Sequence, residues 1–207
     1  MELDIKGNPG NNNSFQDNQV DRTASFNPNA KEVHVNQYLQ QQSPDYRLIS
    51  CFRELQEEVK NDDRLQKKLD DIKRYRTRLP RTIGLKAKLQ DGGFSKEAID
   101  KACRQKQYYA KKSTKYQYYE GAQKIDSYLF AIVSSRFDTY VMPLIVKQSP
   151  LDVIKKVVYE QVIMPVVDKL AFNGEKDTEL RYNIDDIFGM LYYLTGNCHI
   201  NWKEYHV

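Results

Sequence analysis

The chain has 207 residues, of which 40% are hydrophobic, and a formal net charge of +4. This length and composition allow one hydrophobic core, with a further segment attached to it. No run of about 18 or more apolar residues occurs and the first residues, MELDIKGNPGNNN, lack the basic-then-apolar order of a signal peptide, so we expect a cytoplasmic protein that does not span a membrane.

Residues 1–42 are rich in Asn and Gln and poor in large aliphatic side chains. Such a segment buries too little apolar surface to offset the entropy lost on ordering, which favours a mostly disordered leader. Within it, residues 32–38 (EVHVNQY) alternate as in a short strand. The alternative interpretation is a small docking or oligomerisation arm that orders only on a partner.

Residues 43–79 predict two helices in sequence. Ser43 followed by Pro44 is typical of a helix start, with a cap and then a proline in the first turn. Apolar residues at helical spacing mark one stripe from Leu48 to Val59 and a second from Leu65 to Leu79. The charged residues between the stripes are expected to face solvent.

Residues 82–90 predict a short helix, and Ser95 is expected to cap a long one. The long helix contains RQKQYYAKKSTKYQYY (residues 104–119), and residues 92–124 hold eight Lys or Arg against three Asp or Glu. Cations neutralise phosphates and aromatic rings stack on bases, so this pattern suits a nucleic-acid surface. Its candidate residues are Arg104, Lys106, Tyr108, Lys111, Lys112, Lys115 and Tyr116. The alternative is that the tyrosines line the core while the lysines extend beside them to solvent.

Residues 125–170 predict two strongly apolar helices. The first is interrupted at Pro143, and the second begins with a cap at Ser149 and is expected to kink at Pro165, because proline removes a backbone donor. Together with the last helix they predict an all-α fold: a compact helical bundle with a long central helix, spanning residues 43–207.

The stretch from Asn183 to Trp202, NIDDIFGMLYYLTGNCHINW, has the features of a complete helix and its ends. Asn183 is a good N-cap, and acidic residues follow it in the first turn. Gly196 is expected to end the helix in the left-handed conformation. The tail behind it, which includes the single Trp of the chain, is expected to pack back on the bundle as a clasp. The structural signature comprises Gly189, Leu194, Thr195, Gly196, Asn197, Cys198, His199 and Trp202.

Catalytic, cofactor-binding and metal-binding residues are not predicted. Cys51, Cys103 and Cys198 are far apart in the sequence, which argues against a disulfide framework or a four-ligand zinc site. Cys198 and His199 are adjacent, so their side chains point in different directions, and catalysis would need a further orienting group. The sequence also lacks a glycine-rich phosphate loop. We therefore expect a protein that is not an enzyme.

The run GMLYYLTGNCHINW, residues 189–202, resembles the end of the C-terminal domains of effector proteins in bacterial ABC-three-component conflict systems. The upstream runs SSRFDTYVMPLIV and SPLDVIKKVVYEQVIMPVVDKL extend the likeness over about residues 128–202. The resemblance implies an adaptor in defence against phage or plasmid DNA, whose partners are an ABC-type ATPase and a small middle component. The polar leader is no recognisable catalytic domain, so effector, sensor and middle component all stay open, as does the oligomeric state.

Overall fold

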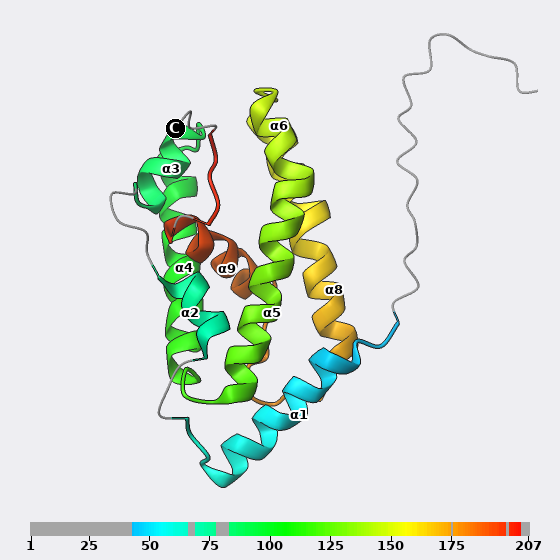
Figure 1. Ribbon diagram of the computed structural model, residues 1–207. Helices are drawn as coiled ribbons and strands as arrows, with labels where there is room; N and C mark the ends of the chain where they lie inside the picture. Colours follow the sequence, from blue (N-terminus) through cyan, green and yellow to red (C-terminus); the bar gives the residue numbers. More distant parts are fainter. Residues whose placement is uncertain (1–42, 66–68, 78–82, 175, 198, 204–207) are drawn as a thin grey trace, which may run out of the picture. The chain divides into compact units, whose positions relative to one another are not determined.

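The computed structural model describes residues 43–65, 69–77, 83–174, 176–197 and 199–203, all within the unit Gln41–Val207. Every regular element in these residues is a helix, which confirms the all-α bundle (Figure 1). The expected leader, residues 1–42, and its strand-like alternation lie outside the described residues.

The first helices begin later than the sequence predicts. α1 spans Tyr46–Asn61, and its N-cap is Asp45 rather than Ser43, with the Asp45 carboxylate accepting from the Leu48 N–H at 3.1 Å. α2 is the short segment Asp70–Arg76. Leu65 was expected in this helix, but its N–H donates to the Tyr118 carbonyl at 2.6 Å instead. The prediction failed because apolar spacing alone does not distinguish a helix from a non-helical segment.

α3 spans Leu85–Asp91 and α4 spans Lys96–Lys115. Ser95 caps α4 as predicted, because its side chain accepts from the Ala98 N–H. Gly93, between the two helices, has a φ of +79°, a conformation that glycine adopts without a steric penalty.

Two long helical segments follow, and each contains a π-helical turn just before a Met-Pro pair. The first is α5 (Glu120–Arg136), η1 (Phe137–Val141) and α6 (Met142–Val146). The second is α7 (Leu151–Val157), η2 (Val158–Ile163) and α8 (Met164–Asn173). The cap predicted at Ser149 was wrong, since the N-cap of α7 is Pro150, which makes no side-chain cap. The wider π turns leave room for Pro143 and Pro165, which cannot donate to the backbone.

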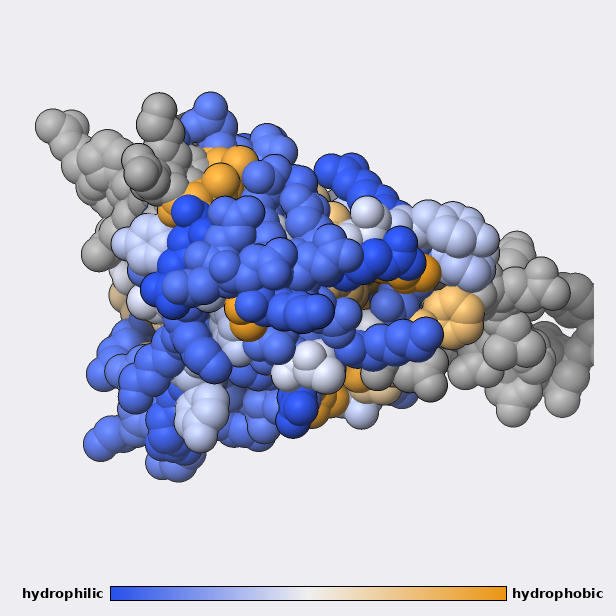
Figure 2. Space-filling model, turned by 90° about the horizontal axis from the view of Figure 1, so that it is seen from below, coloured by the Kyte–Doolittle hydropathy of each residue, from blue (hydrophilic) through white to orange (hydrophobic). Residues whose placement is uncertain are grey.

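The last helix, α9 (Ile184–Gly196), lies inside the bundle (Figure 1). The most extensive contact in the described part is between α4 and α9, while α1 and α2 pack on α5 and the two π turns pack on each other. The fully buried apolar side chains come from all of these helices and include Leu55, Ile72, Tyr109, Phe130, Val162 and Leu191. The face seen from below Figure 1 is mostly hydrophilic, with small separate apolar groups (Figure 2).

The continuous helix Glu120–Val146 has 27 residues and is apolar enough to span a membrane by length and composition alone. In this structure Ile125, Leu129 and Val133 are fully buried within the protein. The helix contacts α1, α2, α8 and α9, and 33% of its most apolar 18-residue stretch is buried inside the bundle.

Candidate functional site

The start of α9 has the N-cap that the sequence predicts, together with an ion pair that the sequence does not predict. The Asn183 side chain accepts from the N–H groups of Asp185 and Asp186, and the Asp186 carboxylate accepts from the Asn183 N–H at 3.0 Å. Asp186 is buried, and its second partner is the Lys112 ammonium at 2.6 Å. Lys112 therefore ties α4 to α9, and its charge is already paired within the fold.

Gly189 is the point of closest approach between α9 and α4. A Cβ added there would lie 2.6 Å from the Gln105 carbonyl oxygen and 2.6 Å from Tyr109 Cβ. One neighbour is a backbone atom and the other is a Cβ atom fixed to the backbone, so neither can move aside without shifting the α4 backbone. Gly189 acts as a packing residue between the two helices, which its place in the signature alone did not show.

Gly196 has a different role from the one predicted. It is the last residue of α9, but neither it nor the C-cap Asn197, with a φ of −97°, has left-handed geometry. The prediction was wrong because a helix can end without the left-handed residue when later residues satisfy its carbonyls. Here the N–H groups of Asn197 and His199 donate to the carbonyls of Tyr193 and Leu194. Gly196 instead lies against the end of the Lys106 side chain.

Trp202 closes the tail onto the bundle. Its indole Nε1 donates to Thr195 Oγ1 at 3.1 Å, and that hydroxyl donates to the Leu191 carbonyl at 2.9 Å. The indole ring meets Phe94 and Phe137 edge to face, with centroids 4.9 and 5.2 Å away. Such contacts combine a large buried area with a satisfied polar atom.

Two further signature residues hold the same end of the molecule. Asn197 Nδ2 donates to the Tyr75 carbonyl at 3.0 Å, which ties the end of α9 to α2, and Leu194 is fully buried. The buried Lys88 ammonium donates to the Ile200 carbonyl at 3.1 Å. Most of the signature therefore maintains the fold around Trp202. Cys198 lies outside the described residues.

His199 lies beside Tyr75, with ring centroids 5.5 Å apart. Its Nε2 atom is buried and has no hydrogen-bond partner in the described part of the chain. Burial lowers the pKa of His199, and hydrogen bonding to the carbonyls of Tyr75 and Arg74 offsets this only in part. The side chain is therefore kept neutral near pH 7.

The basic, Tyr-rich segment divides between core and surface. Tyr109, Tyr116 and Tyr119 are buried, whereas Tyr108 and Tyr118 are 75% and 44% exposed. Of the predicted nucleic-acid surface, Lys106 and Lys112 are partly covered and Tyr116 is in the core. Arg104, Tyr108, Lys111 and Lys115 remain exposed.

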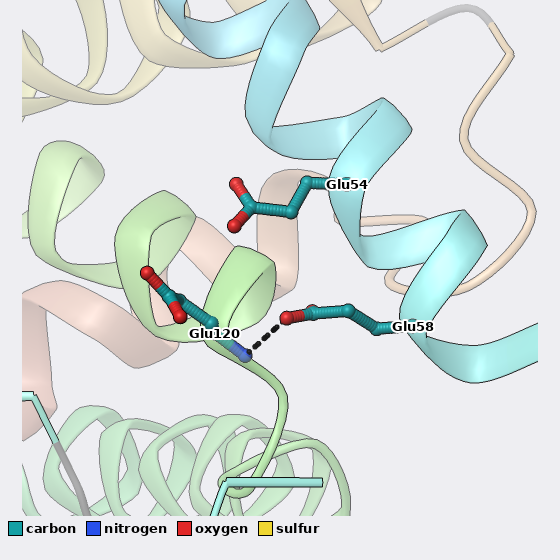
Figure 3. Close-up of side chains that lie close together, drawn as sticks. All are labelled: Glu54, Glu58 and Glu120. Carbon is teal, nitrogen blue, oxygen red and sulfur yellow. Dashed lines mark hydrogen bonds between the residues drawn. The ribbon is translucent and has the colours of Figure 1, made fainter. Parts of the chain in front are cut away.

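Three carboxylates from α1 and α5 meet: Glu54, Glu58 and Glu120, whose oxygens lie within 4.8 Å of one another (Figure 3). Lys124 pairs with Glu54 at 2.7 Å and with Glu120 at 2.8 Å. Burial alone would lower the pKa of Lys124, but these two partners outweigh it and raise the pKa. An ammonium group that stays charged already neutralises the cluster, which makes it a poor cation site.

Glu58 has a structural role within this cluster. Its carboxylate accepts from the Glu120 N–H at 3.1 Å (Figure 3) and from the Gly121 N–H at 2.9 Å, both at the start of α5. Burial raises the pKa of Glu58, and these hydrogen bonds offset part of the rise. Glu58 thus caps a helix 62 residues away in the sequence. No local pattern indicates such a cap.

The sequence pattern did not indicate the role of Asp126, a buried carboxylate on α5. Asp126 accepts from Tyr182 Oη at 2.6 Å and from Ser113 Oγ at 2.7 Å, with the Arg76 guanidinium 3.4 Å away. Burial raises the pKa of Asp126, and these hydrogen bonds and Arg76 oppose the rise. The network links α2, α4, α5 and the segment before α9. Its polar atoms are engaged with one another, as in a structural network.

Residues 84–202, more than half of the chain, match the family model described as CTD9, C-terminal domain 9 of the ABC-three component (ABC-3C) systems. This confirms the resemblance seen over residues 128–202 and extends it towards the N-terminus, so that it includes α3 and α4. No curated protein and no solved structure matches the chain.

Proposed function

The chain belongs to the family of C-terminal domain 9 of the ABC-three component systems, and from this membership we propose that it is a non-enzymatic adaptor of such a system. In this proposal it couples an ABC-type ATPase and a small middle component in the cytoplasm, as part of a defence against phage or plasmid DNA.

The observation that carries the proposal is the use of the family-matched residues. Gly189 permits the contact between α9 and α4, and the Trp202 indole donates a buried hydrogen bond to the Thr195 hydroxyl. Side chains that serve internal packing in this way maintain a rigid scaffold, and a rigid scaffold is what a binding module needs.

Exposed apolar side chains on the second half of the bundle support a protein partner. Tyr140, Val146, Val153 and Tyr159 belong to four consecutive elements, η1, α6, α7 and η2, and each is more than 40% exposed. All four lie within the family-matched residues. Exposed aromatic and aliphatic side chains at a surface are favourable contacts for a protein partner.

The proposal is tested by purifying the tagged chain from its native host, with and without nuclease, and identifying bound proteins by mass spectrometry. Recovery of an ABC-type ATPase and a small protein encoded beside it, unchanged by nuclease, is the expected result. A genome neighbourhood without such an ATPase gene, or recovery of neither protein, would contradict the proposal.

The same purification tests where the partners bind. Replacing Tyr140 and Tyr159 by Ser is expected to reduce recovery of the ATPase or of the middle component, with the thermal unfolding midpoint unchanged. Tyr46→Ser is the matched control, since Tyr46 is 78% exposed and lies outside the family-matched residues. If both variants lost the partner proteins equally, binding would not depend specifically on the surface that includes Tyr140 and Tyr159.

A further inference from the structure

One face of α4 carries a row of exposed side chains. One of them, Lys115, has its ammonium group 4.7 Å from the centroid of the buried Tyr116 ring. The row has three- and four-residue spacing, so its members lie on one side of the helix. We call it the α4 stripe, and it comprises Lys101, Arg104, Tyr108, Lys111 and Lys115. The opposite side of α4 holds the buried Ala102, Tyr109 and Ser113.

The ion pairs found in the described part of the chain include none of the cations of the α4 stripe. No carboxylate lies within ion-pair distance of Lys101, Arg104 or Lys111 there. The Lys115 ammonium contacts the Tyr116 hydroxyl at 2.9 Å, and that hydroxyl lies 3.4 Å from a carboxylate oxygen of Glu179. Two acidic residues, Glu97 and Asp100, lie at the N-terminal end of this face, one turn before Lys101 and Arg104. Lys112 differs from these cations, because its ion pair with Asp186 removes it from the surface charge.

Tyr108 lies in the middle of this row and is 75% exposed. Along the helix Tyr108 follows Arg104 by four residues and precedes Lys111 by three, and its hydroxyl has no partner among the described residues. An exposed aromatic ring flanked by cations offers a face on which a base can stack while the phosphates meet the charges.

We infer that the α4 stripe binds a short single-stranded nucleic acid, with its Lys and Arg on phosphates and Tyr108 stacked on a base. From Lys101 to Lys115 a helix rises about 21 Å, at about 1.5 Å per residue. A stacked strand advances about 3.4 Å per nucleotide, so the stripe spans roughly six nucleotides. A duplex would match the charge but not the ring, since its base faces are already stacked.

This inference is independent of the proposed adaptor role and changes the residues that the sequence pattern indicated. Lys106, Lys112 and Tyr116 leave the candidate surface because they are covered or paired, and Lys101 joins it.

The test is fluorescence anisotropy of a labelled 12-nucleotide oligothymidylate with the full chain, over a series of salt concentrations. Four phosphate contacts predict that the logarithm of the binding constant falls with the logarithm of salt with a slope of about −2.8. The variant K101Q/R104Q/K111Q/K115Q is expected to lose at least about tenfold in affinity and to flatten this slope. Its matched control, R53Q/K60Q/K147Q/K156Q, makes the same charge change at exposed residues elsewhere and is expected to bind as the wild type does.

A second pair of variants tests the ring. Tyr108→Ser is expected to weaken binding by about fivefold or more with the salt slope unchanged, whereas Tyr108→Phe keeps the stacking face and binds as the wild type. The inference is overturned by any of four results: no binding at low salt, equal losses in the stripe variant and its control, equal binding of Tyr108→Ser and wild type, or equal affinity for duplex or for polyglutamate. The last result would assign the stripe to a general anionic or acidic protein partner.

Discussion

At the residue scale, Gly189 and Gly196 of α9 differ in what a methyl group would meet. At Gly189 the methyl group would meet the Gln105 carbonyl and Tyr109 Cβ, and at Gly196 it would meet the flexible end of Lys106. Gly189→Ala is expected to destabilise the protein by about 1–3 kcal/mol or more, since the clash outweighs the gain of about 1 kcal/mol in helix propensity.

Gly196→Ala is the comparison for this prediction and is expected to change stability much less, because Lys106 can move its ammonium group. Urea unfolding of both variants gives the two free energies. Equal effects would mean that α4 and α9 are not held together at Gly189.

His199 gives a pH dependence of known sign. Its pKa in the folded protein is lowered by burial, so the unfolded chain, with a pKa of about 6.5, binds the proton more readily. The stability that the neutral side chain contributes is therefore present above about pH 6.5 and is lost as the pH falls, by at most about 1.4 kcal/mol per pH unit.

Urea unfolding at pH 7.5 and pH 5.5 measures this loss. The wild type is expected to lose more stability between the two values than His199→Gln, in which the titrating group is absent. The other two histidines, His34 and His206, are present in both proteins and cancel in the comparison. Parallel pH profiles would rule out His199 as the source.

At the element scale, the second long helical segment depends on a side chain from the first. Pro165 has no N–H to donate to the carbonyl of Gln161, four residues earlier, and that carbonyl accepts from Arg136 Nε instead. Arg136→Met leaves the carbonyl without this partner and is expected to cost about 1–3 kcal/mol.

A double-mutant cycle separates this contact from general packing. In a Pro165→Ala background the restored N–H can satisfy Gln161, so Arg136→Met is expected to cost at least about 0.5 kcal/mol less there. Arg53→Met, at an exposed position on α1, is the control and is expected to stay within about 0.5 kcal/mol of the wild type. Additive effects would contradict the proposed exchange of partners.

The cap that α1 supplies to α5 is a second contact between elements. Glu58→Ala removes the acceptor for the N–H groups of Glu120 and Gly121 and is expected to cost about 1 kcal/mol. Glu57→Ala, the exposed neighbour on α1, is the matched control and should be nearly neutral. Thermal unfolding compares the two, and a similar change in both variants would remove Glu58 from this role.

At the scale of the whole molecule, α1 and α2 complete a core that the family-matched residues begin. Leu48, Phe52, Leu55 and Ile72 are at most 5% exposed, and all precede residue 84. Burying each contributes about 1.5–3 kcal/mol, and their sum is comparable to the stability of a typical domain.

A fragment of residues 84–202 is therefore expected to lose cooperative unfolding, whereas a fragment of residues 43–207 keeps it. Near-ultraviolet circular dichroism during heating, together with binding of a hydrophobic dye, distinguishes the two. A shorter fragment that unfolds cooperatively at the same midpoint would show that α1 and α2 are additions to a complete domain.

Several features of this protein follow from sequence alone because they are local. Ser95 and Asn183 cap their helices through atoms within three residues of themselves. Helical spacing identified the apolar face of α1, and the strongly apolar composition identified α5 as a core helix. The family was also indicated by a short contiguous run, residues 189–202. Contacts of this kind can be predicted without knowing the rest of the fold.

Tertiary structure alone decided the features whose partners are distant in the chain. The charge of Lys112 is paired within the fold because Asp186, 74 residues away in the sequence, lies next to it in space. Glu58 likewise caps α5 from another helix. The same reasoning separates Tyr109 from Tyr108, since neighbouring residues on a helix point about 100° apart and only the packing partner determines which is buried. Sequence spacing places a residue on a helical face, and the helix packed against that face determines the role of the residue.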